Sequence, residues 1–196
     1  MQPEQLRRTI ARLGAHYLEQ IVRPGLCICV GLGRTLVEVC KRLRPAKIPN
    51  INIVQAMGNV GHEAMDIDFN QMAHEADLYL FGVGSLTSDL IFTRTGIFKS
   101  QDLEQLQKAG SVGDICARFF DIHGVEIPSA FQERIVGITL DDLRSTALTI
   151  AVAGGTDKTE PLIGALNGHL VKVLVTDEQT AQAILDYPDE RRRKGS

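Results

Sequence analysis

The sequence predicts an α/β fold in which a mainly parallel sheet is covered by helices on both faces. Short apolar runs alternate with longer stretches in which apolar residues recur every three or four positions. Within each short run nearly every residue is apolar, which is typical of strands that are buried on both faces. Several runs end in a glycine-rich turn, as expected where a parallel strand passes into the next helix.

Length and composition indicate one globular domain, which we expect to span residues 1–196. The chain is 44% hydrophobic and 23% charged, with a net charge of -3, so overall charge does not indicate a nucleic-acid or membrane partner. No apolar run reaches the ~18 residues that a membrane span requires, and the N-terminus lacks a signal-peptide pattern. We therefore expect a cytoplasmic protein. The only basic cluster in the sequence is RRRK at 191–194, inside a predicted flexible tail at 187–196.

The elements of the N-terminal half follow from local patterns. Residues 3–22 are predicted to form a helix because their apolar residues share one face, and Pro24 with Gly25 ends it. The next predicted elements are, in order, a strand, a helix and two strands, at 26–30, 35–43, 51–55 and 78–83.

The C-terminal half repeats this alternation with one interruption. Strands are predicted at 134–138, 148–153 and 171–175, and helices at 101–109, 160–167 and 178–186. Residues 111–133 break the rhythm. There we expect a short helix that begins near Asp114, followed by a hairpin-like excursion around His123 and Gly124.

The stretch GLGRT, residues 31–35, joins an apolar strand to a helix and is a candidate anion site. Gly31 and Gly33 would let the backbone approach an anion, and Thr35 would offer a hydroxyl at the start of the helix. The alternative is a tight turn in which Thr35 only caps the helix. A dinucleotide fingerprint is disfavoured because position 36 is leucine rather than a third glycine, and no Walker loop is present.

Three further strand ends carry similar segments: FGVGS at 81–85, AVAGGTDK at 151–158 and VTDEQT at 175–180. In the last of them Thr176 and Gln179 have the spacing of a capping box. Because the carboxyl ends of parallel strands lie at one edge of a sheet, we expect all four segments to meet there.

Lys158 lies where a cation is unfavourable. Pro161 is tolerated only in the first turn of a helix, so the helix begins near 158–160 and Lys158 stands at its positive end. Either a local carboxylate, Asp157 or Glu160, compensates this charge, or a ligand phosphate does. Asp114 is predicted to stand at the start of a helix. Its carboxylate either caps this helix or accepts hydrogen bonds from sugar hydroxyls.

Metal and catalytic patterns are not found. The five histidines are scattered without ligand spacing, and the four cysteines form no CxxC pair, so we expect no metal site. No serine, histidine and aspartate arrangement is readable. We therefore expect neither a cofactor nor a catalytic residue set.

Six motifs resemble the effector-binding domain of SorC-type sugar-binding transcriptional regulators. They are VGLGRTL, ADLYLFGVGS, AGSVGDICARFFDIHG, RIVGITLDDLRS, AVAGGTDKTEPLIGALNGH and VKVLVTDEQTAQAILD, and the resemblance runs from about residue 6 to residue 186. It implies a fold similar to that of glucosamine-phosphate deaminase and ribose-phosphate isomerase. It also implies a phosphorylated-sugar effector that controls DNA binding by an attached helix-turn-helix domain.

The resemblance implies roles for the residues of these motifs. The glycine turn would hold a phosphate through Gly31, Gly33, Arg34 and Thr35, and Lys158 would contact phosphate or a sugar oxygen.

Three further residues complete the implied effector site. Asp114 would meet sugar hydroxyls, Gly84 would form a wall of the pocket, and Arg94 would add a second anion contact. The implied assembly is a homo-oligomer, either a dimer or a tetramer.

The chain departs from the family pattern in three places. The family carries a helix-turn-helix domain ahead of this one, so DNA is expected to be reached only through a domain outside this chain. Residues 59–75 fill a space where the family has a further strand, and Leu32 replaces a residue that is commonly aromatic. Two alternatives to the effector domain stay open: a sugar-phosphate isomerase or deaminase on the same fold, and a degenerate fragment that only dimerises.

Overall fold

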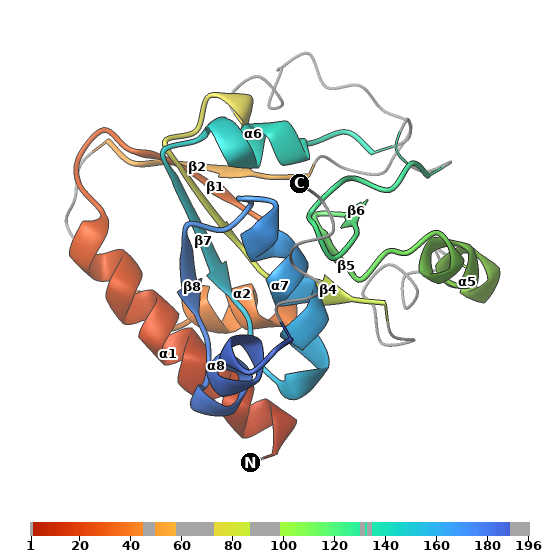
Figure 1. Cartoon of the computed structure of the whole chain (residues 1–196). Helices are drawn as coiled ribbons and strands as arrows, with labels where there is room; N and C mark the ends of the chain where they lie inside the picture. Colours follow the sequence, from red (N-terminus) through yellow and green to blue (C-terminus); the bar gives the residue numbers. More distant parts are fainter. Residues whose placement is uncertain are drawn as a thin grey trace.

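The computed structural model describes residues 2–44, 50–57, 73–86, 99–129, 132 and 135–188. In this part of the chain a five-stranded sheet has the order β2-β1-β3-β7-β8, and every neighbouring pair is parallel (Figure 1). Its strands are β1 Cys27–Val30, β2 Asn52–Gln55, β3 Leu78–Phe81, β7 Leu148–Val152 and β8 Val173–Val175. The predicted α/β fold with a mainly parallel sheet is confirmed.

Helices accompany this sheet in the described part of the chain. They are α1 Pro3–Ile21, α2 Arg34–Cys40, α5 Ser100–Lys108, α6 Leu140–Ser145, α7 Thr159–Asn167 and α8 Glu178–Leu185, with the 3-10 helix η2 Thr156–Lys158 directly before α7. A second, antiparallel sheet has the order β4-β5-β6, formed by Gly84–Ser85, Gly113–Ile115 and Arg118–Phe120.

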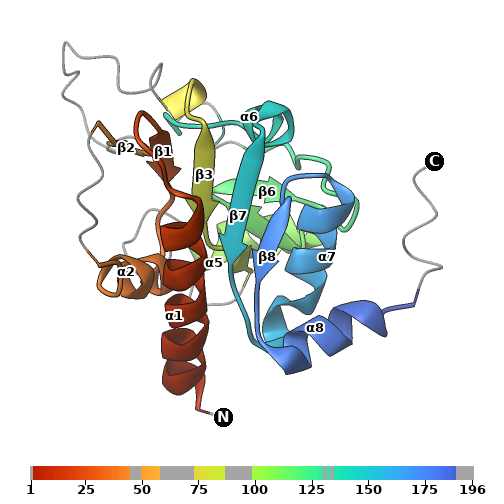
Figure 2. The same ribbon diagram turned by 90° about the vertical axis from the view of Figure 1, so that its left-hand side faces the viewer.

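One face of the large sheet is covered by α1 and α2 (Figure 2). Ile10 of α1 and Leu36 of α2 belong to the same buried cluster as Ile28, Leu80 and Ile150 from three strands. Apolar strand residues therefore meet the apolar helix faces that the sequence predicted, and their removal from water stabilises this layer.

The opposite face is covered by α6, α7 and the small sheet. Tyr79 and Phe81 of β3 are buried there in one cluster with Leu143 of α6, Leu162 of α7 and Phe120 of β6. Because β3 is buried along its whole length, it sits at the centre of the molecule, as its unbroken apolar sequence indicates.

The predicted strand at 134–138 is wrong. Residue 134 lies outside the described residues, and from 135 onward the segment makes only one antiparallel bridge, between Gly137 and Met57. The buried guanidinium of Arg118 donates to the carbonyls of Ile135 and Ile138, at 3.4 and 3.2 Å. These carbonyls are satisfied by a side chain instead of by a neighbouring strand.

The short helix expected to begin near Asp114 is also wrong, because β5 and β6 form a hairpin there. Cys116 and Ala117 connect the two strands with φ of 51° and 64°. Such values are unusual for residues other than glycine. The Asp114 carboxylate accepts a hydrogen bond from the Ala117 N–H at 3.1 Å and closes this turn.

The expected excursion around His123 and Gly124 is present. Phe120 and Glu126 form an antiparallel bridge across it, and Gly124 has a φ of 76°. A β-carbon at Gly124 would lie 2.3 Å from the Cα of Gly168, so the turn needs glycine for space as well as for conformation.

Candidate functional site

The four strand-end segments meet at one edge of the large sheet. They follow β1, β3, β7 and β8, and the parallel pairing of these strands puts their carboxyl ends on the same side (Figures 1 and 2). The predicted convergence is confirmed. In open parallel sheets this edge is where ligands bind.

The first segment, Gly31 to Thr35, lies close to the β5–β6 hairpin. A β-carbon at Gly31 would lie 3.0 Å from both the Cys116 Sγ and the Phe81 Cβ, so glycine allows the close approach of the turn to the hairpin. Gly33 has a φ of 153° and is the N-cap of α2. Thr35 is inside the helix and no side chain caps it, so the capping role considered for Thr35 is wrong.

Asp114 and Gly84 face each other across the small sheet. They are register partners of β5 and β4, and the Asp114 residue is only 5% exposed. A β-carbon at Gly84 would lie 1.8 Å from the Asp114 Oδ1, so only glycine leaves room for the carboxylate. Burial raises the pKa of Asp114 to about 6, although the Ala117 N–H and the charge of Lys158 act in the opposite direction.

Lys158 is the N-cap of α7, as the position of Pro161 predicted. Its Nζ donates to the Ser85 Oγ at 3.0 Å, and the same hydroxyl lies 3.5 Å from the Asp157 Oδ2. Ser85 neighbours Gly84 in β4, so Lys158 reaches the strand that pairs with Asp114. The structure thus brings Gly84, Asp114 and Lys158 together, so that a carboxylate and an ammonium group lie in the same cluster.

A polar latch holds the turn that leads to Lys158. The Asp177 Oδ2 accepts from the Gly155 N–H at 3.0 Å and from the Thr180 hydroxyl at 2.7 Å. The Thr180 hydroxyl in turn accepts from the Gly155 N–H at 2.8 Å. We call Asp177, Thr180 and Gly155 the α8 latch. The turn from Gly155 into η2 is thereby fixed to the start of α8.

The capping box predicted from Thr176 and Gln179 is wrong, and the α8 latch is found in its place. Asp177 is the N-cap of α8, and its side chain accepts from the Thr180 N–H at 3.0 Å. Burial would raise the pKa of Asp177, but hydrogen bonds from Thr180 and Gly155 outweigh burial and lower it. The sequence signal for this latch is an aspartate at the strand end with a threonine three residues later.

Two predicted site residues, Arg34 and Arg94, are not among the contacts described above. Arg94 lies outside the described residues. Arg34 lines a pocket between α1 and α2 together with Glu4, Arg7, Arg8, Val37 and Glu38. The roles proposed for Arg34 and Arg94 at an effector stay predictions.

No group of three or more potential metal ligands gathers among the residues that the structure describes. In the same part of the chain, no helix is both long enough and apolar enough to cross a bilayer.

The chain is similar to known regulators. The family model "Putative sugar-binding domain" matches it in two overlapping pieces, residues 2–76 and 67–186. The deoxyribonucleoside regulator of Bacillus subtilis (strain 168) is 27% identical over 219 aligned residues, which cover 90% of this chain and 70% of the regulator.

Two solved structures share the fold. A DeoR family transcriptional regulator from Listeria monocytogenes superposes with a TM-score of 0.85 at 21% identity, covering 94% of this chain and 89% of that one. The full-length sorbitol operon regulator SorC from Klebsiella pneumoniae has a TM-score of 0.82 at 21% identity, covering 94% of this chain and 74% of that one. Since the family model accounts for nearly the whole chain, the protein belongs to the sugar-binding domain family of SorC/DeoR-type transcriptional regulators.

Proposed function

We propose that this domain binds a phosphorylated sugar at the cluster of Gly84, Asp114 and Lys158. The observation that carries the proposal is the buried Asp114 carboxylate beside a lysine at the ligand-binding edge of a parallel sheet. A buried carboxylate is costly, and it is retained where its oxygens are needed as acceptors.

The two charged residues suit the two parts of such a ligand. The Asp114 Oδ2 accepts from Ala117, and the Oδ1 accepts no hydrogen bond within the described part of the chain. That oxygen would accept from sugar hydroxyls. Lys158 at the N-terminus of α7 and the backbone of the Gly31 to Thr35 turn would hold the phosphate, because both present positive potential to an anion.

The regulatory part of the proposal rests on the relatives. This chain spans 70% of the length of the Bacillus subtilis regulator. We infer that a helix-turn-helix domain outside this chain reads DNA, and that the sugar phosphate shifts a dimer or tetramer equilibrium that controls it. We also infer that the domain acts without catalysis.

An enzymatic alternative has one observation in its favour. A carboxyl group whose pKa is raised to about 6, like that of Asp114, is suited to proton transfer near neutral pH. Isomerases and deaminases of sugar phosphates need such a base. Turnover of ribose 5-phosphate or glucosamine 6-phosphate by the purified chain would favour this alternative over the effector domain.

The binding proposal is tested by thermal melts of the full chain over a set of phosphorylated sugars. A ligand at 100 times its Kd stabilises the native state by about 2.7 kcal/mol. For a chain of this size that raises the Tm by roughly 5 to 10 °C.

The variant Lys158→Ala should lose at least about tenfold in affinity for the best sugar phosphate, because it removes a charge-assisted hydrogen bond. Its stability without ligand should fall, because Lys158 donates to the Ser85 hydroxyl and its charge favours the ionised form of the buried Asp114. Lys108→Ala, at the exposed end of α5, is the matched control and should melt and bind like the wild type. An equal ligand-induced shift in Lys158→Ala and wild type would remove Lys158 from the site.

A further inference from the structure

The Ser85 hydroxyl lies between two opposite charges at the ligand-binding edge of the sheet. It accepts a hydrogen bond from the Lys158 Nζ at 3.0 Å and donates to the Asp157 Oδ2 at 3.5 Å. Ser85 is 6% exposed, and its strand β4 is held in place by pairing with β5. A serine hydroxyl can donate one hydrogen bond and accept others, so Ser85 serves a cation and a carboxylate at the same time.

Asp157 reaches this hydroxyl from the turn that precedes α7. A β-carbon at Gly155 would lie 2.7 Å from the Asp157 Oδ1, so the carboxylate folds back over the turn. It does not cap η2, whose N-cap Gly155 has no side-chain cap. Asp157 is an exposed residue, and 3.5 Å is long for a hydrogen bond between oxygens. The carboxylate can therefore leave Ser85 at little cost.

A second carboxylate lies near the same lysine. Burial raises the pKa of Asp114 and the charge of Lys158 acts against this effect, so the two groups interact. When Asp114 and Asp157 are both ionised, one cation faces two anions, and both repel a phosphate that approaches Lys158. Asp114 is 5% exposed and closes the β5–β6 turn, so it has no room to move aside. Asp157 is the carboxylate that can give way.

We propose that Asp157 is an internal competitor of the ligand phosphate. Without ligand its carboxylate occupies the Ser85 hydroxyl beside Lys158, and the phosphate displaces it on binding. This inference rests on the phosphorylated-sugar function proposed above, and it adds a residue that weakens phosphate binding instead of supplying it. A site that must first release its own carboxylate binds with an affinity reduced by the population of the occupied state.

The variant Asp157→Asn removes the competing charge and keeps the size of the side chain. We expect it to bind phosphorylated probes about three- to tenfold more tightly than the wild type at low salt. The gain should shrink at high salt, because salt screens an exposed carboxylate. A merely structural role of Asp157 predicts a loss or no change of affinity, so a gain confined to phosphorylated probes is specific to competition.

Glu160→Gln is the matched control. Glu160 is also an exposed carboxylate in the first turn of α7, and its Oε1 accepts from the Tyr187 hydroxyl at 2.9 Å. This variant changes the net charge by the same amount as Asp157→Asn, but it leaves Asp157 and Ser85 intact. It should therefore bind phosphate like the wild type.

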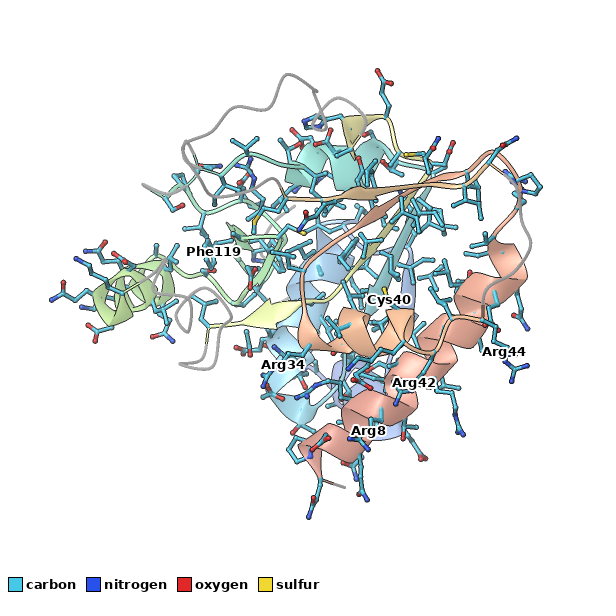
Figure 3. The ribbon with its side chains drawn as sticks, turned by 180° about the vertical axis from the view of Figure 1, so that it is seen from behind. Arg8, Arg34, Cys40, Arg42, Arg44 and Phe119 are labelled. Carbon is cyan, nitrogen blue, oxygen red and sulfur yellow. The ribbon has the colours of Figure 1, made fainter. Side chains whose placement is uncertain are left out.

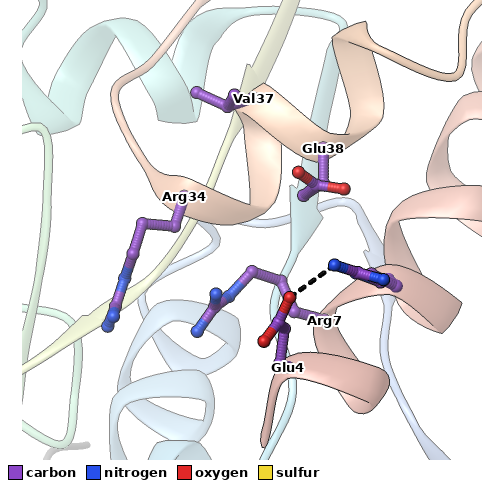
Figure 4. Close-up of a pocket in the computed structure, with 6 residues that line it drawn as sticks. Glu4, Arg7, Arg34, Val37 and Glu38 are labelled. Atoms are coloured by element: carbon purple, nitrogen blue, oxygen red, sulfur yellow. Dashed lines mark hydrogen bonds and ion pairs between the residues drawn. The ribbon is translucent and has the colours of Figure 1, made fainter.

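Helices α1 and α2 offer anions another positive region, which needs its own control. Figure 3 shows Arg8, Arg34 and Arg42 on this side of the molecule, and Figure 4 shows the pocket between the two helices, where Arg8 pairs with Glu4. A local excess of cations attracts anions without selecting them. Phosphate bound there would be weakened by Arg8→Gln and would not respond to Asp157→Asn.

The test uses the full chain and three probes: inorganic phosphate, fructose 6-phosphate and fructose. Calorimetry at low and at high salt gives the affinity of the wild type, Asp157→Asn, Glu160→Gln and Arg8→Gln for each probe. All three replaced residues are exposed, so the variants should fold. Unchanged or weaker phosphate binding in Asp157→Asn would overturn the competition. Equal gains in Glu160→Gln, or an equal gain with fructose, would do the same.

Failure of the effector proposal has a different signature. If no phosphorylated sugar of the melting screen binds more tightly than inorganic phosphate, the sugar effector is wrong, while a gain of Asp157→Asn with inorganic phosphate still supports the competition. If Lys158→Ala weakens binding of fructose 6-phosphate but Asp157→Asn leaves it unchanged, the effector site stands and the competition is wrong. Absence of phosphate binding in the wild type and in Asp157→Asn alike would overturn both.

Discussion

At the scale of single residues, the burial of Asp114 opposes the ionised form that its proposed role as a hydrogen-bond acceptor would use. Asp114 is 5% exposed, and its ionised form is disfavoured because burial raises its pKa to about 6. An acid whose pKa is higher in the folded state than in the unfolded chain binds more protons when folded. Its contribution to stability is therefore complete below the unfolded pKa and is lost as pH rises through the folded pKa.

We predict that this effect of burial is visible in the pH dependence of unfolding. Between about pH 4 and pH 7 the wild type should lose up to roughly 3 kcal/mol relative to Asp114→Asn, which cannot ionise and still accepts from the Ala117 N–H. Urea unfolding of both proteins from pH 4 to pH 7.5 measures the difference. Parallel pH profiles would mean that Asp114 titrates as an exposed carboxylate does.

Gly84 gives a second prediction at this scale, with Gly82 of the same turn as its control. A β-carbon at Gly84 would meet the Asp114 Oδ1 at 1.8 Å, whereas one at Gly82 would meet only the Val152 carbonyl at 3.9 Å. Gly84→Ala should cost about 1 to 3 kcal/mol and displace the carboxylate. Gly82→Ala should stay within about 0.5 kcal/mol. Thermal melts compare the two variants, and equal losses would contradict a specific contact with Asp114.

At the scale of elements, the α8 latch connects the last helix to the turn that carries Lys158. Gly155 has a φ of 107° and donates to both Asp177 and Thr180, and the Lys158 N–H in turn donates to the Gly155 carbonyl at 2.9 Å. The position of Lys158 thus depends on a side-chain contact 22 residues away from the turn.

Thr180→Val tests this dependence because Thr180 is fully buried and valine has nearly the same shape. Loss of its hydroxyl should cost about 1 to 2 kcal/mol, since the Gly155 N–H keeps only one acceptor. It should also weaken sugar-phosphate binding several-fold. Thr180→Ser keeps the hydroxyl and should restore affinity while losing only the packing of one methyl group, about 0.8 kcal/mol. If both variants lose affinity equally, the latch does not position Lys158.

The large sheet could be predicted from sequence because its strands are apolar and end in recognisable turns. The small sheet could not. Its turn uses Cys116 and Ala117 at positive φ, where pattern reasoning expects glycine, and a side chain, Asp114, closes it. The predicted strand at 134–138 failed for a related reason, because the side chain of Arg118 takes the carbonyls that a strand would have used.

Helix α6 was not predicted, although its sequence carries a local signal. Thr139 and Asp142 have the spacing of a capping box, and the Thr139 Oγ1 accepts from the Asp142 N–H at 3.2 Å. The helix is only Leu140–Ser145, too short for apolar periodicity to appear. A helix this short can be predicted from its capping residues but not from the spacing of its apolar residues.

At the scale of the whole molecule, the parallel topology made the location of the site predictable but not its composition. Four strand ends had to share an edge once the sheet was parallel. The pairing of Gly84 with Asp114 required the two-residue strand β4, which leaves no periodic signal. The pocket between α1 and α2 could not be predicted for a different reason: Arg7 and Arg34 are far apart in sequence and line one pocket only when α1 packs against α2.

Charge distribution gives the last prediction. The sequence pointed to RRRK at 191–194 as the only basic cluster, and the structure adds a second one on α1 and α2. We expect this chain to bind duplex DNA weakly and without sequence preference, with a log–log salt slope of about -3, because only a few phosphates are neutralised at once. Removal of residues 189–196 should lower this affinity only in part, and adding Arg7→Gln with Arg8→Gln should lower it further. Fluorescence anisotropy with unrelated duplexes at several salt concentrations measures each step. A nanomolar Kd for one duplex at physiological salt would show that the chain reads DNA sequence by itself, contrary to a domain that depends on a separate DNA-binding partner.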